Sequence, residues 1–300
     1  MSVVRRTFGG VQLSPICLGT MRLDPARLGR DDAVRLLAHL VDHGVDTVHT
    51  SHEYASHAYA LDVLAAFRRA HPARRLVHVV KLAEPHFEDP FTLDPARLLA
   101  RLDAAQAELG VDRVDVLQWL LRSKPIEDGP RLALLRDRGR ALADALDARV
   151  REGRLGAWGV FPYGVPFAEA AVGLPGCAGL VSYLGLAERE HVGQLDALQE
   201  AGQAFVAIRP LWGGRLTARG LADPQGDHRV RRLADALELD GDEVAAEALA
   251  WPLRHPAVAS VMVSLHDTAQ ADAALRAVEG VRPDPLAFHA VAARLTAAGA

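Results

Sequence analysis

Two segments of the chain carry residues that could exchange protons with a substrate. Residues 45–49 form a largely apolar segment, and the polar run that follows it ends at Tyr54. Lys81 ends a second apolar segment, 76–81. An ammonium group beside a phenol favours the phenolate, so the pair can serve as an acid and a base. We therefore expect a pocket built around Tyr54 and Lys81, with His49 as a third group that exchanges protons.

The same segments raise the alternative of a metal site. His49 and His52 are three residues apart beside Glu53, and Glu84 and His86 follow in the next segment. Histidine and carboxylate ligands suit zinc and similar ions. Their spacing matches no established metal-binding motif, so we expect a polar pocket wall with exposed loop histidines and no metal.

The elements that must position these residues follow a regular alternation. Eight apolar segments of strand length are separated by amphipathic segments of helix length. The expected strands are 15–20, 45–49, 76–81, 114–120, 155–160, 178–183, 204–209 and 257–263. The expected helices are 31–43, 57–69, 94–109, 131–151, 167–171, 191–201 and 243–253. Strands that are apolar on both faces are typical of parallel sheets, and eight β/α units close a barrel.

The expected fold is a (β/α)8 TIM barrel with additions at both ends. Gly9-Gly10 between two short β-prone segments predicts an N-terminal β-hairpin. Residues 284–298 predict a C-terminal helix, and 217–241 predict a loop with a short helix at 230–237. A doubly wound open sheet is the alternative, but no Gly-x-Gly-x-x-Gly motif follows the first strand. Because the chain has no linker or low-complexity tract, we expect a single domain over residues 1–300.

Composition and charge exclude several classes of partner. The net charge of −4 and the pI near 6.3 give no general attraction to nucleic acid or to an anionic membrane. No apolar run reaches the ~18 residues that a membrane helix needs, and the first ten residues lack the apolar core of a signal peptide. Cys17 and Cys177 lie in apolar runs, so we expect buried thiols in a reducing compartment and a cytoplasmic protein.

The C-terminal ends of the strands predict the rest of the pocket, because the loops that follow the strands of such barrels converge there. The expected wall comprises Met21, His52, Leu120, Phe161 and Trp212. Apart from His52 these side chains are apolar or aromatic. They either fill unused space in the pocket or contact an apolar substrate.

Several short motifs occur in an order and spacing that resemble the aldo-keto reductases. They are the run 14–21, the segment 44–54, Lys81, Val114-Asp115, the glycine-flanked segment 155–160, and Pro210-Leu211 with Gly214 and Leu216. The resemblance covers nearly the whole chain. It implies a barrel with NADPH across its mouth and a catalytic tetrad of Asp, Tyr, Lys and His.

Two of the four tetrad positions are changed in this chain. By resemblance, Tyr54 matches the proton-donating tyrosine, and Lys81 matches the lysine that lowers the pKa of that tyrosine. The aspartate that normally pairs with the lysine falls at His49, and the histidine falls at Leu120. A leucine cannot hydrogen-bond a carbonyl oxygen. We expect His49 to be neutral, because two neighbouring cations would repel each other.

The positions that hold the cofactor in the family are also altered. The Ser-Asn pair that holds the nicotinamide amide falls at Phe161-Pro162, and proline has no N–H to donate. The segment 263–268, which supplies the family's cation for the 2′-phosphate, has no Lys or Arg, although Gln270 matches an adenine-side position. Each loss would cost ~1–3 kcal/mol. Because ~1.4 kcal/mol is tenfold in affinity, several losses would weaken a micromolar cofactor to millimolar, and we expect no bound cofactor.

Three functions remain open at this point. The first is an enzyme that uses Tyr54, Lys81 and His49 for cofactor-independent acid–base chemistry on a small molecule, of lyase, dehydratase, isomerase or cyclase type. The second is an NADPH-dependent carbonyl reductase that tolerates the substitutions. The third is a non-catalytic subunit or regulatory partner of another protein.

Overall fold

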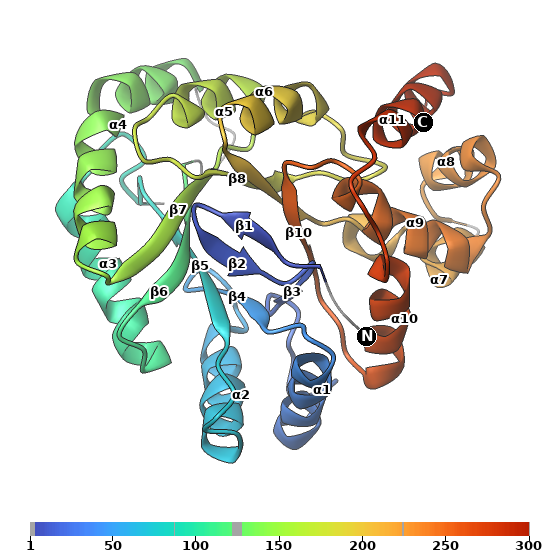
Figure 1. Cartoon of the computed structure of the whole chain (residues 1–300), viewed down its shortest axis with the longest axis horizontal. Coiled ribbons are helices and arrows are strands. Elements are labelled where there is room, and N and C mark those ends of the chain that lie inside the picture. The colour runs from blue at the N-terminus through green and yellow to red at the C-terminus, as the bar shows by residue number, and fades with distance from the viewer. Residues whose placement is uncertain (1–3, 87, 122–127, 224, 300) are drawn as a thin grey trace.

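Eight parallel strands close into a barrel in the computed structural model, which describes residues 4–86, 88–121, 128–223 and 225–299. Helices surround the barrel, as Figure 1 shows. The strands are β3 (Ile16–Gly19), β4 (Thr47–Ser51), β5 (Val77–Ala83), β6 (Val114–Leu120), β7 (Leu155–Phe161), β8 (Gly179–Tyr183), β9 (Ala204–Ile208) and β10 (Val258–Val263). They pair in chain order, and β10 closes the ring against β3. The predicted (β/α)8 fold is confirmed.

The strands are buried on both faces, which explains why most of their residues are apolar. In β5 the side chain of Val79 belongs to the core inside the barrel, whereas Val80 packs in the layer between barrel and helices. The register places Ser51 of β4 beside Lys81 of β5. Because side chains alternate along a strand, His49 and Ser51 share one side of β4, and Lys81 shares that side of β5.

The helices form the outer layer. They are α1 (Arg30–Asp42), α2 (His57–Ala70), α3 (Pro95–Leu109), α4 (Asp128–Arg151), α5 (Val165–Val172), α6 (Leu195–Glu200), α7 (Ala218–Ala222), α8 (His228–Leu237), α9 (Gly241–Leu253), α10 (Thr268–Val278) and α11 (Pro285–Ala297). Local sequence sets several ends. Asp94 caps α3 with Pro95 at its first position, and Gly110 closes the helix at φ 61°. Asp240 and Glu243 form a capping box at the start of α9.

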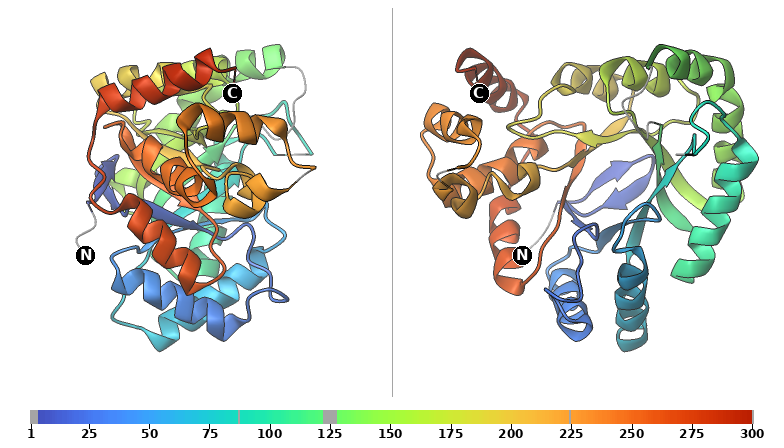
Figure 2. Two further views of the ribbon diagram at one scale, coloured as in Figure 1. Left: turned by 90° about the vertical axis from the view of Figure 1, so that its right-hand side faces the viewer. Right: turned by 180° about the vertical axis from the view of Figure 1, so that it is seen from behind.

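Three helices depart from the expectation, and one of them is α7, which lies in the segment expected to be a loop before residue 230 and is capped by the side chain of Thr217. The predicted helix at 230–237 begins earlier, as α8, because the side chain of Asp227 accepts from the backbone of Arg229 and caps it. The helix α10 was not predicted at all, although Asp267 caps it and its Ala271, Ala274 and Leu275 are buried. Figure 2 shows α7, α8 and α9 (orange) gathered beside one flank of the barrel.

The N-terminal hairpin closes one end of the barrel. Strands β1 (Arg6–Phe8) and β2 (Val11–Leu13) pair antiparallel across Gly9-Gly10, where both glycines have positive φ. Phe8 and Leu13 are fully buried in the core inside the barrel. Gly159 must be glycine, because a Cβ there would lie 2.4 Å from the ring of Phe8. With this end plugged (Figure 1), the C-terminal ends of the strands form the open mouth.

Both cysteines are free and buried, as predicted for Cys17 and Cys177. Among the helices in the described ranges, none combines the length and the apolar character needed to cross a membrane.

Candidate active site

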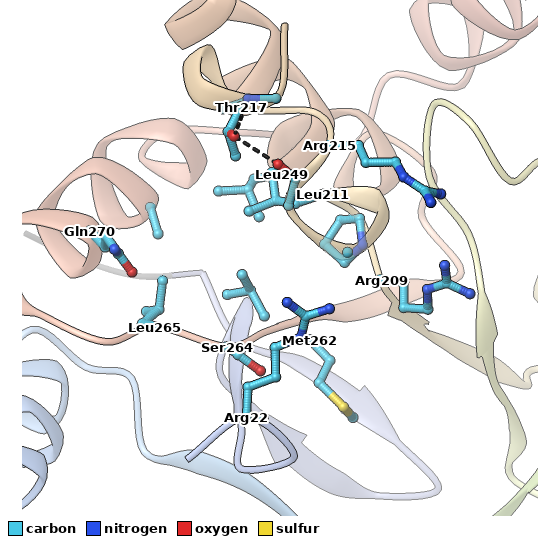
Figure 3. Close-up of a pocket in the computed structure, with 18 of the residues that line it drawn as sticks. Arg22, Arg209, Leu211, Arg215, Thr217, Leu249, Met262, Ser264, Leu265 and Gln270 are labelled. Atoms are coloured by element: carbon cyan, nitrogen blue, oxygen red, sulfur yellow. Dashed lines mark hydrogen bonds between the residues drawn. The ribbon is translucent and has the colours of Figure 1, made fainter. Parts of the chain in front are cut away.

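A cleft of about 1950 Å³ runs from the barrel mouth to α10. His49, Tyr54 and Lys81 line its inner end. The loop 209–215 after β9 lines its middle, and Gln270 of α10 lies toward its outer end. Figure 3 shows part of this cleft, with the guanidinium group of Arg22 between the loop after β9 and the segment after β10. The structure therefore brings together the three residues predicted for acid–base chemistry.

A chain of hydrogen bonds across the barrel fixes His49. Gln118 of β6 donates from Nε2 to the backbone oxygen of Val181 at 3.1 Å, so its Oε1 accepts from Nε2 of His49 at 2.6 Å. The proton of His49 is therefore on Nε2, which leaves Nδ1 to accept a long hydrogen bond from the hydroxyl of Tyr54 at 3.5 Å. The tyrosine thus faces a neutral proton acceptor.

His49 is neutral in this environment. It is 1% exposed, and burial together with the charge of Lys81 lowers its pKa to about 3. The hydrogen bond from His49 to Gln118 acts in the opposite direction but is the smaller effect. The neutral state agrees with the sequence-based expectation. It means that no negative charge replaces the family's aspartate beside Lys81.

Lys81 lies against the face of Tyr54. Its Nζ is 4.2 Å from the centre of the tyrosine ring, and the residue is 8% exposed. Burial lowers the pKa of Lys81 to about 8, although the negative charge of Glu53 opposes the shift. Across the described ranges, no carboxylate lies within ion-pair distance of this Nζ. The amine is therefore partly neutral near physiological pH.

The resemblance predicted that Lys81 lowers the pKa of Tyr54, and that prediction is wrong here. Burial raises the pKa of Tyr54 above its usual value, and the charge of Glu53 adds to the shift. The physical reason is geometric, because the ammonium group approaches the ring face rather than the hydroxyl oxygen. Tyr54 is therefore a phenol at neutral pH and can donate a proton or a hydrogen bond.

Glu53 stands behind the pocket and does not line it. Its Oε1 accepts from Arg101 at 2.6 Å and from the backbone N–H of Ala83 at 3.0 Å, and its Oε2 accepts from Ser51. Burial would raise the pKa of Glu53, but the hydrogen bonds from Ser51 and Arg101 hold it below its usual value. The positive charge of Arg101 already balances the carboxylate of Glu53, so Glu53 does not form an ion pair with Lys81.

The predicted pocket wall is correct in part. Met21 and Phe161 line the cleft. Leu120, Trp212 and His52 do not. Leu120 is 2% exposed and belongs to the core inside the barrel, below the cleft. The imidazole of His52 contacts Glu108 and His57 instead.

The ring of Trp212 was predicted to face the pocket because the residue follows a strand, but it belongs to the outer core layer. Its backbone has φ 45°, and its ring stacks against the guanidinium groups of Arg215 and Arg229. Tyr163 and Arg209, which do line the cleft, also have positive φ. Such backbone strain in bulky residues concentrates at functional sites.

Sequence reasoning missed three residues of the mouth. Gln118 and Asp115 are the polar residues of β6, and a polar residue in a mostly apolar strand was the signal for a buried polar contact. No sequence pattern pointed to Tyr163 or Tyr183, because Tyr163 follows β7 whereas Tyr183 ends β8. The ring of Tyr163 stacks on Phe161 at 4.1 Å between centroids, and Tyr183 meets Phe161 edge-on at 5.2 Å. These rings form an aromatic wall on the β7–β8 side of the mouth.

The two ends of the cleft differ in how they suit NADPH. Beyond the mouth the cleft is rich in arginine. Arg22, Arg215, Arg219 and Arg276 line it without a carboxylate at ion-pair distance among the described residues, and Asp223, Asp227 and Asp242 line it as well. His266 also presents a buried Nδ1 with no hydrogen-bond partner there. Phosphate groups would fit this region.

At the mouth the fit fails. Phe161 has no polar side chain, Pro162 has no N–H, and the amide of Gln118 is already bound to His49 and Val181. Toward the outer end, the Oε1 atom of Gln270 is also engaged, because it accepts from the backbone N–H of His266. Phe161, Pro162 and Gln118 therefore do not fit a bound nicotinamide carboxamide.

Two clusters among the described residues could hold a metal ion, and both lie apart from His49. They are His52, His57 and Glu108, and Asp196, His255 and His289. In the first, Oε2 of Glu108 is 2.9 Å from His52 and 3.0 Å from His57. The residues considered as metal ligands from the sequence do not come together around His49, because Glu84 forms an ion pair with Arg97 and Glu53 forms one with Arg101.

Comparison with known proteins agrees with the barrel. The model of the aldo/keto reductase family matches residues 15–284. Aldo-keto reductase AKR11C1 from Bacillus halodurans superposes in its holo form with a TM-score of 0.74 at 18% identity, and in its apo form with 0.72 at 16%. Each match covers 98% of this chain and 96% of the other. At such identity the likeness shows the fold alone.

No match was found among curated protein sequences. The family model nevertheless spans most of the chain, from the first barrel strand to the start of the last helix. The chain belongs to the aldo/keto reductase family.

Proposed function

We propose that this protein is an enzyme that moves protons on a small molecule held against Tyr54, without NADPH-dependent hydride transfer. The observation that carries the proposal is the hydrogen-bonded pair of Tyr54 and the neutral His49 beside an unpaired Lys81. The reaction type is that of a lyase, dehydratase, isomerase or cyclase. We place the reaction in the cytoplasm, because both cysteines are free thiols.

The roles follow from the protonation states. Tyr54 is a phenol at neutral pH, so it can donate to a substrate oxygen on which negative charge develops. Lys81, with a pKa of about 8, supplies a neutral amine that can accept a proton from carbon. A catalytic base works best with a pKa near the operating pH. His49 accepts from Tyr54 and keeps the phenol oriented, because Gln118 fixes its ring.

The aromatic wall supports the same reading. Phe161, Tyr163 and Tyr183 occupy the β7–β8 side of the mouth, where the family holds a nicotinamide amide with polar side chains. Lys81 is 8% exposed, and burial shifts the pKa values of both Tyr54 and Lys81, so little water reaches the pair. Exclusion of water strengthens each electrostatic interaction there.

A second candidate, a carbonyl reductase, is favoured by one observation. The arginines of the outer cleft could hold the phosphates of NADPH through Arg22, Arg215 and Arg276. If bound, NADPH would supply a hydride, and Tyr54 would donate the proton to the carbonyl oxygen. The cationic region serves equally for an anionic substrate.

Hydrogen exchange tests the proposed function. The protein is incubated in D2O with a series of aldehydes, ketones and 2-oxo acids, and loss of the α-proton signal is followed by NMR without cofactor. The rate of exchange measured with the wild type should fall by about 10²–10⁴-fold in Tyr54→Phe. Tyr59→Phe is the matched control, because the hydroxyl of Tyr59 binds the backbone oxygen of Leu28 outside the cleft. Equal exchange in Tyr54→Phe and the wild type, or turnover only with NADPH, would contradict the proposal.

A further inference from the structure

Lysine is almost absent from this chain. Of the 34 Lys and Arg residues, only Lys81 and Lys124 are lysine. Arginine stays protonated at all physiological pH values, whereas a buried lysine can lose its proton and become a nucleophile. The chain thus uses arginine at almost every cationic position. At the position that faces Tyr54 it has a lysine, and therefore a primary amine.

No carboxylate among the described residues forms an ion pair with the amine of Lys81. Its nearest negative charge is Glu53, which is engaged by Arg101, Ser51 and the backbone of Ala83. On the neighbouring strand β4, His49 stands on the same side as Lys81 and is neutral. The amine lines the cleft at 8% exposure, so it is desolvated but reachable.

We propose that Lys81 reacts covalently with the carbonyl carbon of an aldehyde or ketone that carries an anionic group, and forms an iminium ion with it. This inference rests on the proposed function and names its substrate class. The anionic group follows from the cleft that opens from Lys81, since among its described lining residues five arginines (Arg22, Arg209, Arg215, Arg219 and Arg276) outnumber three aspartates (Asp223, Asp227 and Asp242). Burial, which lowers the pKa of Lys81 to about 8, supplies the neutral amine.

The steps balance without a further reactant. The nitrogen of Lys81 attacks the carbonyl carbon while one proton moves from nitrogen to oxygen, giving a carbinolamine. The hydroxyl leaves as water with the proton of the Tyr54 phenol, and the nitrogen lone pair forms the C=N bond. The phenolate of Tyr54 then removes the proton from the adjacent carbon, which gives a neutral enamine and restores the phenol. Hydrolysis reverses the sequence and releases Lys81.

Reductive trapping tests the inference. The full-length protein is incubated with pyruvate and cyanoborohydride, with Nα-acetyl-lysine in the same solution as a solvated amine, and labelled sites are mapped by peptide mass. Lys81 should be labelled at least about tenfold faster than Nα-acetyl-lysine at neutral pH, since each unit of lowered pKa gives tenfold more neutral amine. Acetone, which lacks the anionic group, should label Lys81 more slowly than pyruvate. Labelling of Lys81 no faster than the free amine would overturn the iminium, and equal labelling by acetone would overturn the anionic substrate class.

Two variants sharpen the test. His49→Asp places a carboxylate on the strand beside Lys81, which should keep the amine charged and slow its labelling at least about tenfold. Lys124→Arg removes the other lysine and should leave labelling of Lys81 unchanged. Undiminished labelling of Lys81 in a folded His49→Asp variant would contradict the inference.

The outcome separates this inference from the proposed function. If Lys81 is not trapped but the Tyr54-dependent exchange in D2O persists, the covalent step is wrong and the proton-transfer function stands. If Lys81 is not trapped and no exchange depends on Tyr54, both are wrong. Trapping that disappears in Lys81→Arg, together with exchange that disappears in the same variant, supports both.

Discussion

Nδ1 of His49 lies 3.5 Å from the phenolic oxygen of Tyr54, at the position where the resemblance to the aldo-keto reductases leads us to expect a carboxylate. A carboxylate there would pair with Lys81 and keep it charged. The neutral imidazole instead accepts from Tyr54 and leaves the amine unpaired. With no charge on His49, burial dominates at Lys81 and lowers its pKa to about 8.

The contact between Gln118 and His49 should matter for both stability and activity. Gln118→Met leaves the buried Nε2–H of His49 without its acceptor, which should lower the free energy of unfolding by about 1–3 kcal/mol in urea titrations. Exchange activity should fall too, because the imidazole loses its fixed orientation. Gln199→Met, the same change at an exposed position, should stay within about 0.5 kcal/mol of the wild type. Equal stability of the two variants would show that the contact is not maintained in solution.

The pH dependence of the reaction should follow Lys81. The amine is protonated below its pKa of about 8, so activity should rise as pH increases toward 8 and level off above it. His49 has a pKa of about 3 and should add no inflection near neutrality. Exchange rates from pH 6 to 9 measure this profile. A rate that falls as pH rises through 8 would mean that Lys81 acts as an ammonium ion.

His49 should make the fold sensitive to acid. Its pKa is about 3 when folded and near 6.5 when unfolded, so the unfolded state binds more protons between these values. The free energy of unfolding should therefore fall with decreasing pH over this range, by up to about 1.4 kcal/mol per unit from this residue.

His49→Gln cannot take up that proton, so its stability relative to the wild type should improve as pH falls from 6.5 to 4. His228, whose side chain is 81% exposed, provides the control substitution His228→Gln. Denaturant unfolding at a series of pH values gives the comparison. Parallel curves for His49→Gln and the wild type would show that His49 is not buried in its neutral form.

Loss of the ion pair between Arg101 and Glu53 should lower the free energy of unfolding by a large amount. Arg101→Met leaves the carboxylate of Glu53, which is 7% exposed, without its cation, and should cost about 3–5 kcal/mol of unfolding free energy. The exposed pair of Arg140 and Asp144 is the control, because Arg140→Met should cost less than about 1 kcal/mol. Similar losses in the two variants would indicate that Glu53 is solvated.

The barrel could be predicted from the sequence because its strands are buried on both faces, so that apolar runs such as 114–120 coincide with β6. Tyr54, Lys81 and His49 could be placed together because they end or follow neighbouring strands. The arginine-rich cleft could not be predicted, since Arg22 and Arg276 come from opposite ends of the chain and line one cleft only in the closed barrel. The direction of the Trp212 ring was also beyond prediction, because it depends on one residue with positive φ.

Titration of the purified protein with NADPH, followed by fluorescence, tests most directly the central claim that Tyr54 moves protons in a site that does not hold this cofactor. Phe161 and Pro162 offer the nicotinamide amide no polar side chain, and the amide of Gln118 is engaged by His49 and Val181. We therefore predict only weak binding, in the millimolar range or above, and no NADPH consumption with carbonyl compounds. Saturable binding in the low micromolar range, with NADPH oxidised in the presence of a carbonyl substrate, would contradict the claim and establish the reductase.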